Sequence, residues 1–119
     1  MRKLLAATIV VAGLALAGPA WAHAHLVSAD PSVGGTVAPT DKLKLNFSEG
    51  VEIDFCKVDV TGDDGADKGP AKLALDPANA KVLLVTLPVP LTPGGYKVHW
   101  HVMSVDTHRT EGTFPFTVK

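Results

Sequence analysis

Histidine is the residue type of this chain with the clearest capacity for metal chemistry. The 119 residues include five histidines, and all five lie near the two ends of the segment that follows residue 22. If the chain is cut after Ala22, His23 becomes the first residue and offers both its α-amine and its imidazole to one metal ion. The reference pKa values of these groups are about 7.7 and 6.5, so both nitrogens can lose their protons near neutral pH. The predicted new terminus is therefore a bidentate chelator.

Asp106 and His108 form a second candidate pair, two residues apart. In an extended segment such residues project to the same side, so a carboxylate oxygen and an imidazole nitrogen could reach one ion. Together with His23 the pair supplies three nitrogens and one oxygen, and leaves one position for water. This donor set suits Cu(II), which also binds most tightly in the divalent series. The hypothesis is one Cu(II) per chain, held by His23, Asp106 and His108.

Two other arrangements of histidines remain open. In the first, a free amine followed by His25 at the third position wraps Cu(II) with two deprotonated backbone amides, which requires a flexible tail. In the second, His99 and His101 share one face of a strand, about 7 Å apart, with Met103 beyond them. The alternation around His99 and His101 favours a solvent-facing strand surface. The strand pattern from Leu26 onward favours His25 as a neighbour of the site or a solvent-facing residue.

Residues 1–22 have the three parts of a bacterial secretory signal peptide. A positive start at Arg2 and Lys3 precedes an apolar run over residues 4–17, and small residues at positions 20 and 22 fit the cleavage rule. The apolar run is too short to cross a bilayer, which takes roughly 20 residues. We therefore expect a cleaved Sec-type signal peptide over 1–22, a mature domain over 23–119 without a membrane span, and a periplasmic location.

The segment after residue 22 is a series of short strands separated by Gly, Pro and Asp turns. Polar and apolar residues alternate in most of them, as in strands with one buried face. The pattern predicts seven strands, near residues 26–29, 42–47, 56–61, 72–75, 81–87, 96–103 and 113–118, and a solvated acidic loop over 62–69. Seven short strands in 97 residues favour an all-β fold, a small Greek-key β-sandwich.

The apolar members of the alternating strands form the predicted core, which consists of Leu43, Leu45, Phe47, Val58, Val60, Tyr96, Val98, Trp100, Phe114 and Phe116. Cys56 shares their parity, which favours a small buried hydrophobic residue over a reactive thiol.

Composition excludes several classes of protein. The predicted mature segment carries nine basic and twelve acidic side chains, a net charge of −3, which is unfavourable for binding nucleic acid or an anionic membrane. One cysteine rules out a disulfide framework, a cysteine-rich zinc site and a CxxC redox pair. We expect a monomeric domain whose chemistry comes from histidines, carboxylates and backbone groups.

Several motifs occur in a fixed order along the chain. They are His23-Ala24-His25-Leu26-Val27-Ser28-Ala29-Asp30-Pro31, Leu45-Asn46-Phe47-Ser48-Glu49, Gly95-Tyr96-Lys97-Val98-His99-Trp100, Ser104-Val105-Asp106-Thr107-His108 and Gly112-Thr113-Phe114-Pro115-Phe116-Thr117-Val118. With these motifs the chain resembles the CopC-like periplasmic copper-binding proteins over nearly all of residues 23–119.

The resemblance implies a cupredoxin-like or immunoglobulin-like β-barrel or sandwich that binds Cu(II) in the periplasm. It assigns the copper ligands to the terminal His23, to Asp106 and to His108, and makes Glu49 an outer-shell group that orients the amine or a bound water. It also implies a CopD-like inner-membrane copper transporter as partner. Some members carry a Met-rich Cu(I) site, but Met103 is the one methionine after residue 22. We therefore expect no such site here.

Two other classes of function compete with copper binding. A terminal-histidine copper site also serves oxidative enzymes that act on polysaccharides, but these need exposed aromatic side chains, and the aromatics here fall mostly on the predicted core face. A metal-free adhesion module is the other alternative, since β-sandwiches often serve that purpose. The sequence favours a binding protein that sequesters or delivers copper and is not an enzyme.

Overall fold

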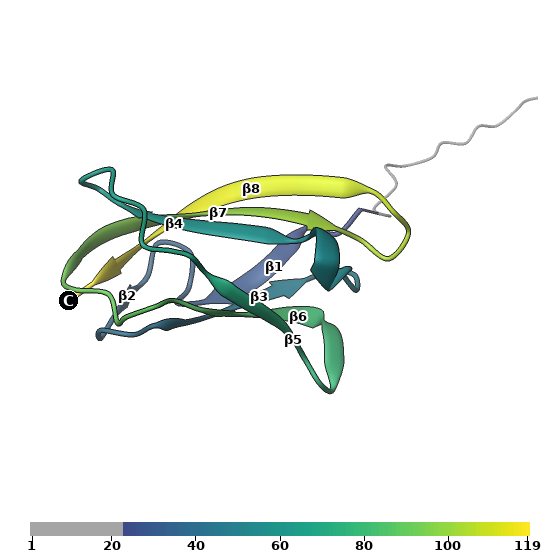
Figure 1. Ribbon diagram of the computed structural model, residues 1–119, viewed down its shortest axis with the longest axis horizontal. Coiled ribbons are helices and arrows are strands. Elements are labelled where there is room, and N and C mark those ends of the chain that lie inside the picture. Colours follow the sequence, from purple (N-terminus) through teal and green to yellow (C-terminus); the bar gives the residue numbers. More distant parts are fainter. Residues whose placement is uncertain (1–22) are drawn as a thin grey trace, which may run out of the picture.

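The protein consists of two β-sheets packed face to face, as a computed structural model of the chain shows (Figure 1). The structure describes residues 23–119, so the predicted signal peptide over 1–22 lies outside the described residues. Within them lie β1 (Leu26–Asp30), β2 (Thr36–Val37), β3 (Lys42–Phe47), the 3₁₀ turn η1 (Ile53–Phe55), β4 (Lys57–Gly62), β5 (Lys72–Asp76), β6 (Asn79–Thr86), β7 (Gly94–Met103) and β8 (Arg109–Val118). The predicted all-β sandwich is confirmed.

The strand order is β1-β3-β6-β5 in the first sheet and β2-β8-β7-β4 in the second. The hairpins β5–β6 and β7–β8 each stay within one sheet, and every other connection between consecutive strands of the described chain crosses from one sheet to the other. Such crossings are expected of a Greek-key sandwich. No helix within residues 23–119 is long and apolar enough to cross a membrane.

The structure adds two short elements to the seven predicted strands. β2 has two residues and η1 has three, which is too short for either to produce a periodic pattern. β8 also begins at Arg109 rather than near residue 113. Its first inward positions hold Thr110 and Gly112, so the apolar half of the alternation is missing there.

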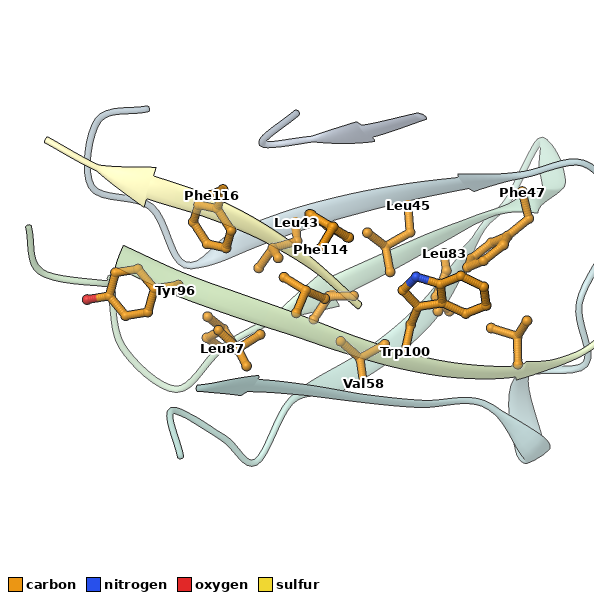
Figure 2. Close-up of a cluster of buried hydrophobic side chains, with 14 of the residues drawn as sticks. Leu43, Leu45, Phe47, Val58, Leu83, Leu87, Tyr96, Trp100, Phe114 and Phe116 are labelled. Carbon is orange, nitrogen blue, oxygen red and sulfur yellow. The ribbon is translucent and has the colours of Figure 1, made fainter. Parts of the chain in front are cut away.

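The core lies between the two sheets and contains all ten residues predicted for it (Figure 2). Leu45, Val60 and Val98 are completely buried. Burying a side chain of this size contributes roughly 1.5–3 kcal/mol relative to leaving it exposed, which is why the alternation fixes the face of each strand. Further buried residues come from β6, where Val82, Leu83 and Val85 interrupt strict alternation.

Close packing of Trp100 depends on a glycine in the neighbouring strand. Gly112 lies opposite Trp100 in the β7–β8 ladder, and a Cβ at this position would lie 2.5 Å from Cζ2 of the indole. The indole also meets Phe47 edge-on, with ring centroids 5.2 Å apart and planes at 73°. The indole is therefore confined from two sides.

We expect Gly112→Ala to lower the free energy of unfolding by about 1–3 kcal/mol, because the added methyl group forces the confined indole to move. Chemical denaturation of the purified domain measures this change. Thr113→Ala, at the exposed next position, is the matched control and should change stability by less than about 0.5 kcal/mol. Equal stability of Gly112→Ala and the wild-type chain would contradict the packing described.

Candidate metal centre

The five-residue connection between β7 and β8 brings Asp106 and His108 together. The backbone N–H of Ser104 donates to the carbonyl of His108 (2.9 Å), and the N–H of Thr107 donates to the carbonyl of Ser104 (2.8 Å). Thr107, the fourth residue of this connection, has a φ of +74°, in the left-handed region. Glycine is the usual residue there, so a β-branched threonine holds the loop in a strained conformation next to both candidate ligands.

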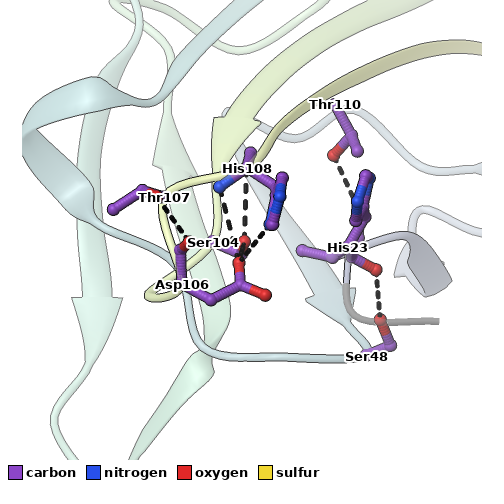
Figure 3. Close-up of polar contacts among 8 residues, drawn as sticks. His23, Ser48, Ser104, Asp106, Thr107, His108 and Thr110 are labelled. Carbon is purple, nitrogen blue, oxygen red and sulfur yellow. Dashed lines mark hydrogen bonds and ion pairs between the residues drawn. The ribbon is translucent and has the colours of Figure 1, made fainter. Parts of the chain in front are cut away.

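The Asp106 carboxylate is the centre of a small polar network (Figure 3). Its Oδ1 lies 3.2 Å from Nδ1 of His108 and accepts hydrogen bonds from the Ser104 hydroxyl and from the backbone N–H of His108 (3.4 Å). The hydrogen bond from the buried Ser104 hydroxyl, aided by His108, lowers the pKa of Asp106 below its ordinary value. The carboxylate therefore stays ionised and available as an oxygen ligand throughout the neutral range.

The imidazole of His23 lies against that of His108, although the two residues are far apart in the sequence. Their ring centroids are 4.2 Å apart and their planes differ by 12°, so the rings stack face to face (Figure 3). The structure thus brings the predicted terminal ligand beside the predicted Asp106–His108 pair.

Two hydroxyl groups fix the backbone of residues 23–25. The Ser48 hydroxyl accepts a hydrogen bond from the N–H of His25 (3.0 Å) and donates one to the carbonyl of His23 (3.4 Å). The Thr110 hydroxyl donates to the carbonyl of Ala24 (2.6 Å), and the Ala24 side chain is completely buried. This segment is thereby attached to both sheets, through the residue after β3 and through β8.

The donor atoms of His23, Asp106 and His108 are close but do not yet converge. They do not form a set of three within 4.8 Å of one another in the described part of the chain. An imidazole nitrogen directs its lone pair in the ring plane, so two parallel stacked rings cannot point at the same ion. At least one ring must turn, and it has room, because the His108 side chain is 52% exposed and His23 borders an open pocket of about 590 Å³.

Other predicted residues occupy different positions. Glu49 is half-buried, and among the described residues it makes no hydrogen bond or ion pair with His23, Asp106 or His108. The outer-shell role expected of Glu49 stays a prediction. The His25 side chain is exposed, and the backbone of His25 also accepts a hydrogen bond from the N–H of Ser48 (2.9 Å).

Cys56 is half-buried and packs against the core, so the prediction of a buried residue is confirmed only in part. The residue comes directly after η1 and before β4, so it does not share the strand geometry that its parity indicated. Burial raises the pKa of its thiol, and Sγ lies 3.2 Å from the carbonyl of Glu52. A protonated, hydrogen-bonded thiol fits the unreactive role expected of it.

Sequence reasoning missed the hydroxyl groups that organise the centre, namely Ser48, Ser104 and Thr110. No sequence pattern indicated Thr110, because the apolar half of the alternation is missing at the start of β8 and the strand was predicted only from residue 113. Ser104 is the buried polar residue of the described chain. It follows β7 directly, where its backbone forms the hydrogen bonds with Thr107 and His108 that close the loop.

Fold and site together define a small two-sheet β-sandwich with a histidine- and carboxylate-rich centre at one end. The family model of the CopC domain matches residues 26–119. The chain belongs to the CopC family, as its motifs indicated.

Relatives of this family resemble the chain over most of its length. It is 41% identical to Protein YobA of Escherichia coli K12 over 100 residues, which covers 83% of this chain and 81% of that protein. It is 36% identical to Copper resistance protein C of Pseudomonas syringae pv. tomato, over 94% of this chain and 93% of that protein. The crystal structure of PcoC, a methionine-rich copper resistance protein from Escherichia coli, superposes with a TM-score of 0.73 at 34% identity, over 82% of this chain and all of PcoC.

We expect Ser104→Ala to raise the pKa of Asp106 toward its ordinary value, because the largest stabilising contact of the carboxylate is removed. Carboxyl NMR titration of the metal-free domain measures the shift. A lowered pKa stabilises the fold above the unfolded-state pKa, and this contribution is lost as pH falls through the folded value. The variant should therefore lose more stability at pH 6 than at pH 3. An unchanged Asp106 titration would contradict the network described.

Proposed function

We propose that the protein is a periplasmic Cu(II)-binding protein that sequesters copper or delivers it to a partner. In this proposal the α-amine and imidazole of a processed His23, the Asp106 carboxylate and the His108 imidazole hold one Cu(II) per chain. The stacking of the His23 ring on the His108 ring, beside Asp106, carries the proposal. The candidate ligands His23 and His108 are exposed, so copper can enter and leave the site. In this proposal copper is therefore the cargo that the protein carries.

The family supports copper as the metal. Several relatives are copper resistance proteins by name, among them those of Pseudomonas syringae and Xanthomonas campestris, and PcoC is another. The donor set supports the same metal on chemical grounds, since imidazole, amine and carboxylate ligands suit Cu(II).

The chain departs from its methionine-rich relative in the ligands that would select Cu(I). PcoC is described as methionine-rich, whereas Met103 is the one methionine of residues 23–119. Thioether sulfur is a soft donor that selects Cu(I). We therefore propose a Cu(II) protein without a Met-rich Cu(I) site.

Backbone contacts favour this ligand set over the mode in which the terminal segment wraps the ion. Wrapping requires the backbone nitrogen of His25 to lose its proton and bind copper. That N–H donates to the Ser48 hydroxyl, and the Ala24 side chain is buried. Releasing both would cost the contacts that attach the segment to the sheets.

Exposure of the aromatic residues favours binding over oxidative catalysis. Phe55, 57% exposed, is the exposed aromatic residue of the described chain, and the other Phe, Tyr and Trp side chains there are buried. A flat aromatic platform for a polysaccharide is thus missing from residues 23–119.

The proposal also includes delivery of copper to a CopD-like membrane transporter. It further includes export of the chain, with cleavage of the signal peptide after Ala22.

A chain that begins at His23 should bind one Cu(II), and adding one alanine before His23 should weaken binding by at least about 100-fold, because the amine is displaced. His108→Ala should have an effect of similar size, larger than the 10- to 100-fold typical of losing an outer-shell partner. Calorimetric titration and electron paramagnetic resonance measure both. His25→Ala is the matched control, with an expected change below about fivefold. A larger loss for His25→Ala than for His108→Ala would support the wrapping mode.

Copper affinity should fall by at least about 1,000-fold between pH 7 and pH 5, because protons compete with the metal for three nitrogen donors, two imidazoles and one amine. Asp106 contributes nothing to this loss, since its pKa is lowered and it remains ionised over the whole interval. Competition titration against a chelator of known affinity at each pH gives the profile. An affinity independent of pH would rule out these nitrogen donors.

A further inference from the structure

A second group of metal-binding side chains lies on the outer face of the sheet that contains β7 and β8. Alternation along β7 turns Trp100 inward and its neighbours His99 and His101 outward. Glu111 of β8 lies directly opposite His101 in the antiparallel ladder, and the two strands run side by side in Figure 1. The hairpin thereby holds two imidazoles and one carboxylate next to each other on one surface.

The distances within this group are those of a site that needs little adjustment. Glu111 Oε1 lies 2.9 Å from His99 Nε2 and 3.6 Å from His101 Nδ1, and the two imidazole centroids are 4.4 Å apart. One candidate ligand atom from each residue lies within 4.8 Å of the other two, which holds for no other trio of His, Cys, Asp or Glu in residues 23–119. Atoms bound to one ion at 2.0–2.2 Å lie about 3–4 Å apart. Small side-chain rotations therefore suffice.

Contacts with the two histidines leave the Glu111 carboxylate ionised. The hydrogen bond with His99, and then the charge of His101, lower the pKa of Glu111. Other charged residues on this face are Asp59, opposite His99, Lys57, opposite His101, and also Lys97 and Arg109. Lys57 and Asp59 pair with each other at 3.9 Å, which offsets part of their effect on the group.

We propose that His99, His101 and Glu111 form a second metal site, for a divalent transition-metal ion such as Zn²⁺ or Cu²⁺. Two imidazoles and a carboxylate are a donor set that zinc uses when water completes its coordination, and imidazole also suits copper. The side chains are 45%, 40% and 62% exposed, so an ion and its water ligands can reach them from solvent.

This site goes beyond the proposed function because it is independent of processing. None of its ligands is the α-amine, so it forms equally in a chain with residues ahead of His23. The terminal centre, by contrast, requires cleavage. The two proposals can therefore fail separately.

The test uses Zn²⁺ and residues 23–119 preceded by one alanine and carrying His108→Ala, which removes the terminal centre. All core residues lie within this segment. Calorimetry should show one saturable equivalent of Zn²⁺, and NMR should show shifts at the His99 and His101 rings. His99→Ala, His101→Ala and the size-matched Glu111→Gln should each weaken binding by at least about tenfold. Lys97→Gln, on the same face of β7, should change it less than twofold.

Absence of saturable Zn²⁺ binding in this background would overturn the second site, and so would binding that His99→Ala and Glu111→Gln leave unchanged. The melting temperature of each metal-free variant checks that the exposed substitutions leave the fold intact. Failure here leaves Cu(II) binding by the processed, wild-type terminus untouched. Conversely, loss of the terminal copper centre leaves this Zn²⁺ result unaffected.

Discussion

The attachment of residues 23–25 to the ends of β3 and β8 is the constraint on which the metal centre depends. Ser48 joins the backbones of His23 and His25 to the first sheet, and Thr110 joins that of Ala24 to the second. Without these contacts His23 would sample many positions, and each ordered residue costs roughly 1–2 kcal/mol of backbone entropy. Folding itself therefore orders His23 beside the Asp106–His108 loop, and metal binding need not supply this ordering free energy.

The β7–β8 hairpin provides ligands for both proposed sites. Its connection carries Asp106 and His108, and its outer surface carries His99, His101 and Glu111. The inner surface of the same strands fills the core with Trp100 and Phe114. The alternation of side chains along this hairpin thus places core residues on its inner face and candidate metal ligands on its outer face. Of the two proposed sites, only the one that includes the β7–β8 connection requires cleavage before His23.

Much of the fold follows from the sequence, because alternation reports directly which face of a strand is buried. The strand over Lys42–Phe47 and all ten predicted core residues are confirmed. The grouping of His23 with Asp106 and His108 was a hypothesis from their donor chemistry, which the family resemblance also implied, because local patterns do not report contacts between distant segments. Glu111 escaped notice because its pairing with His101 depends on the register of the hairpin, and a shift of one residue would turn it to the other face. The turn that sets this register includes Thr107 in the left-handed conformation. A glycine at that position would have indicated the turn in the sequence, but the residue is a threonine.

The account depends most directly on the copper ligands of the processed chain. Anomalous diffraction at the copper edge, from crystals of a chain beginning at His23 grown with Cu(II), locates them. We predict a copper peak bonded to the amine and ring nitrogens of His23, to the His108 ring and to the Asp106 carboxylate. If the processed chain binds Cu(II) but the copper peak is not bonded to His23, the proposed ligand set is wrong.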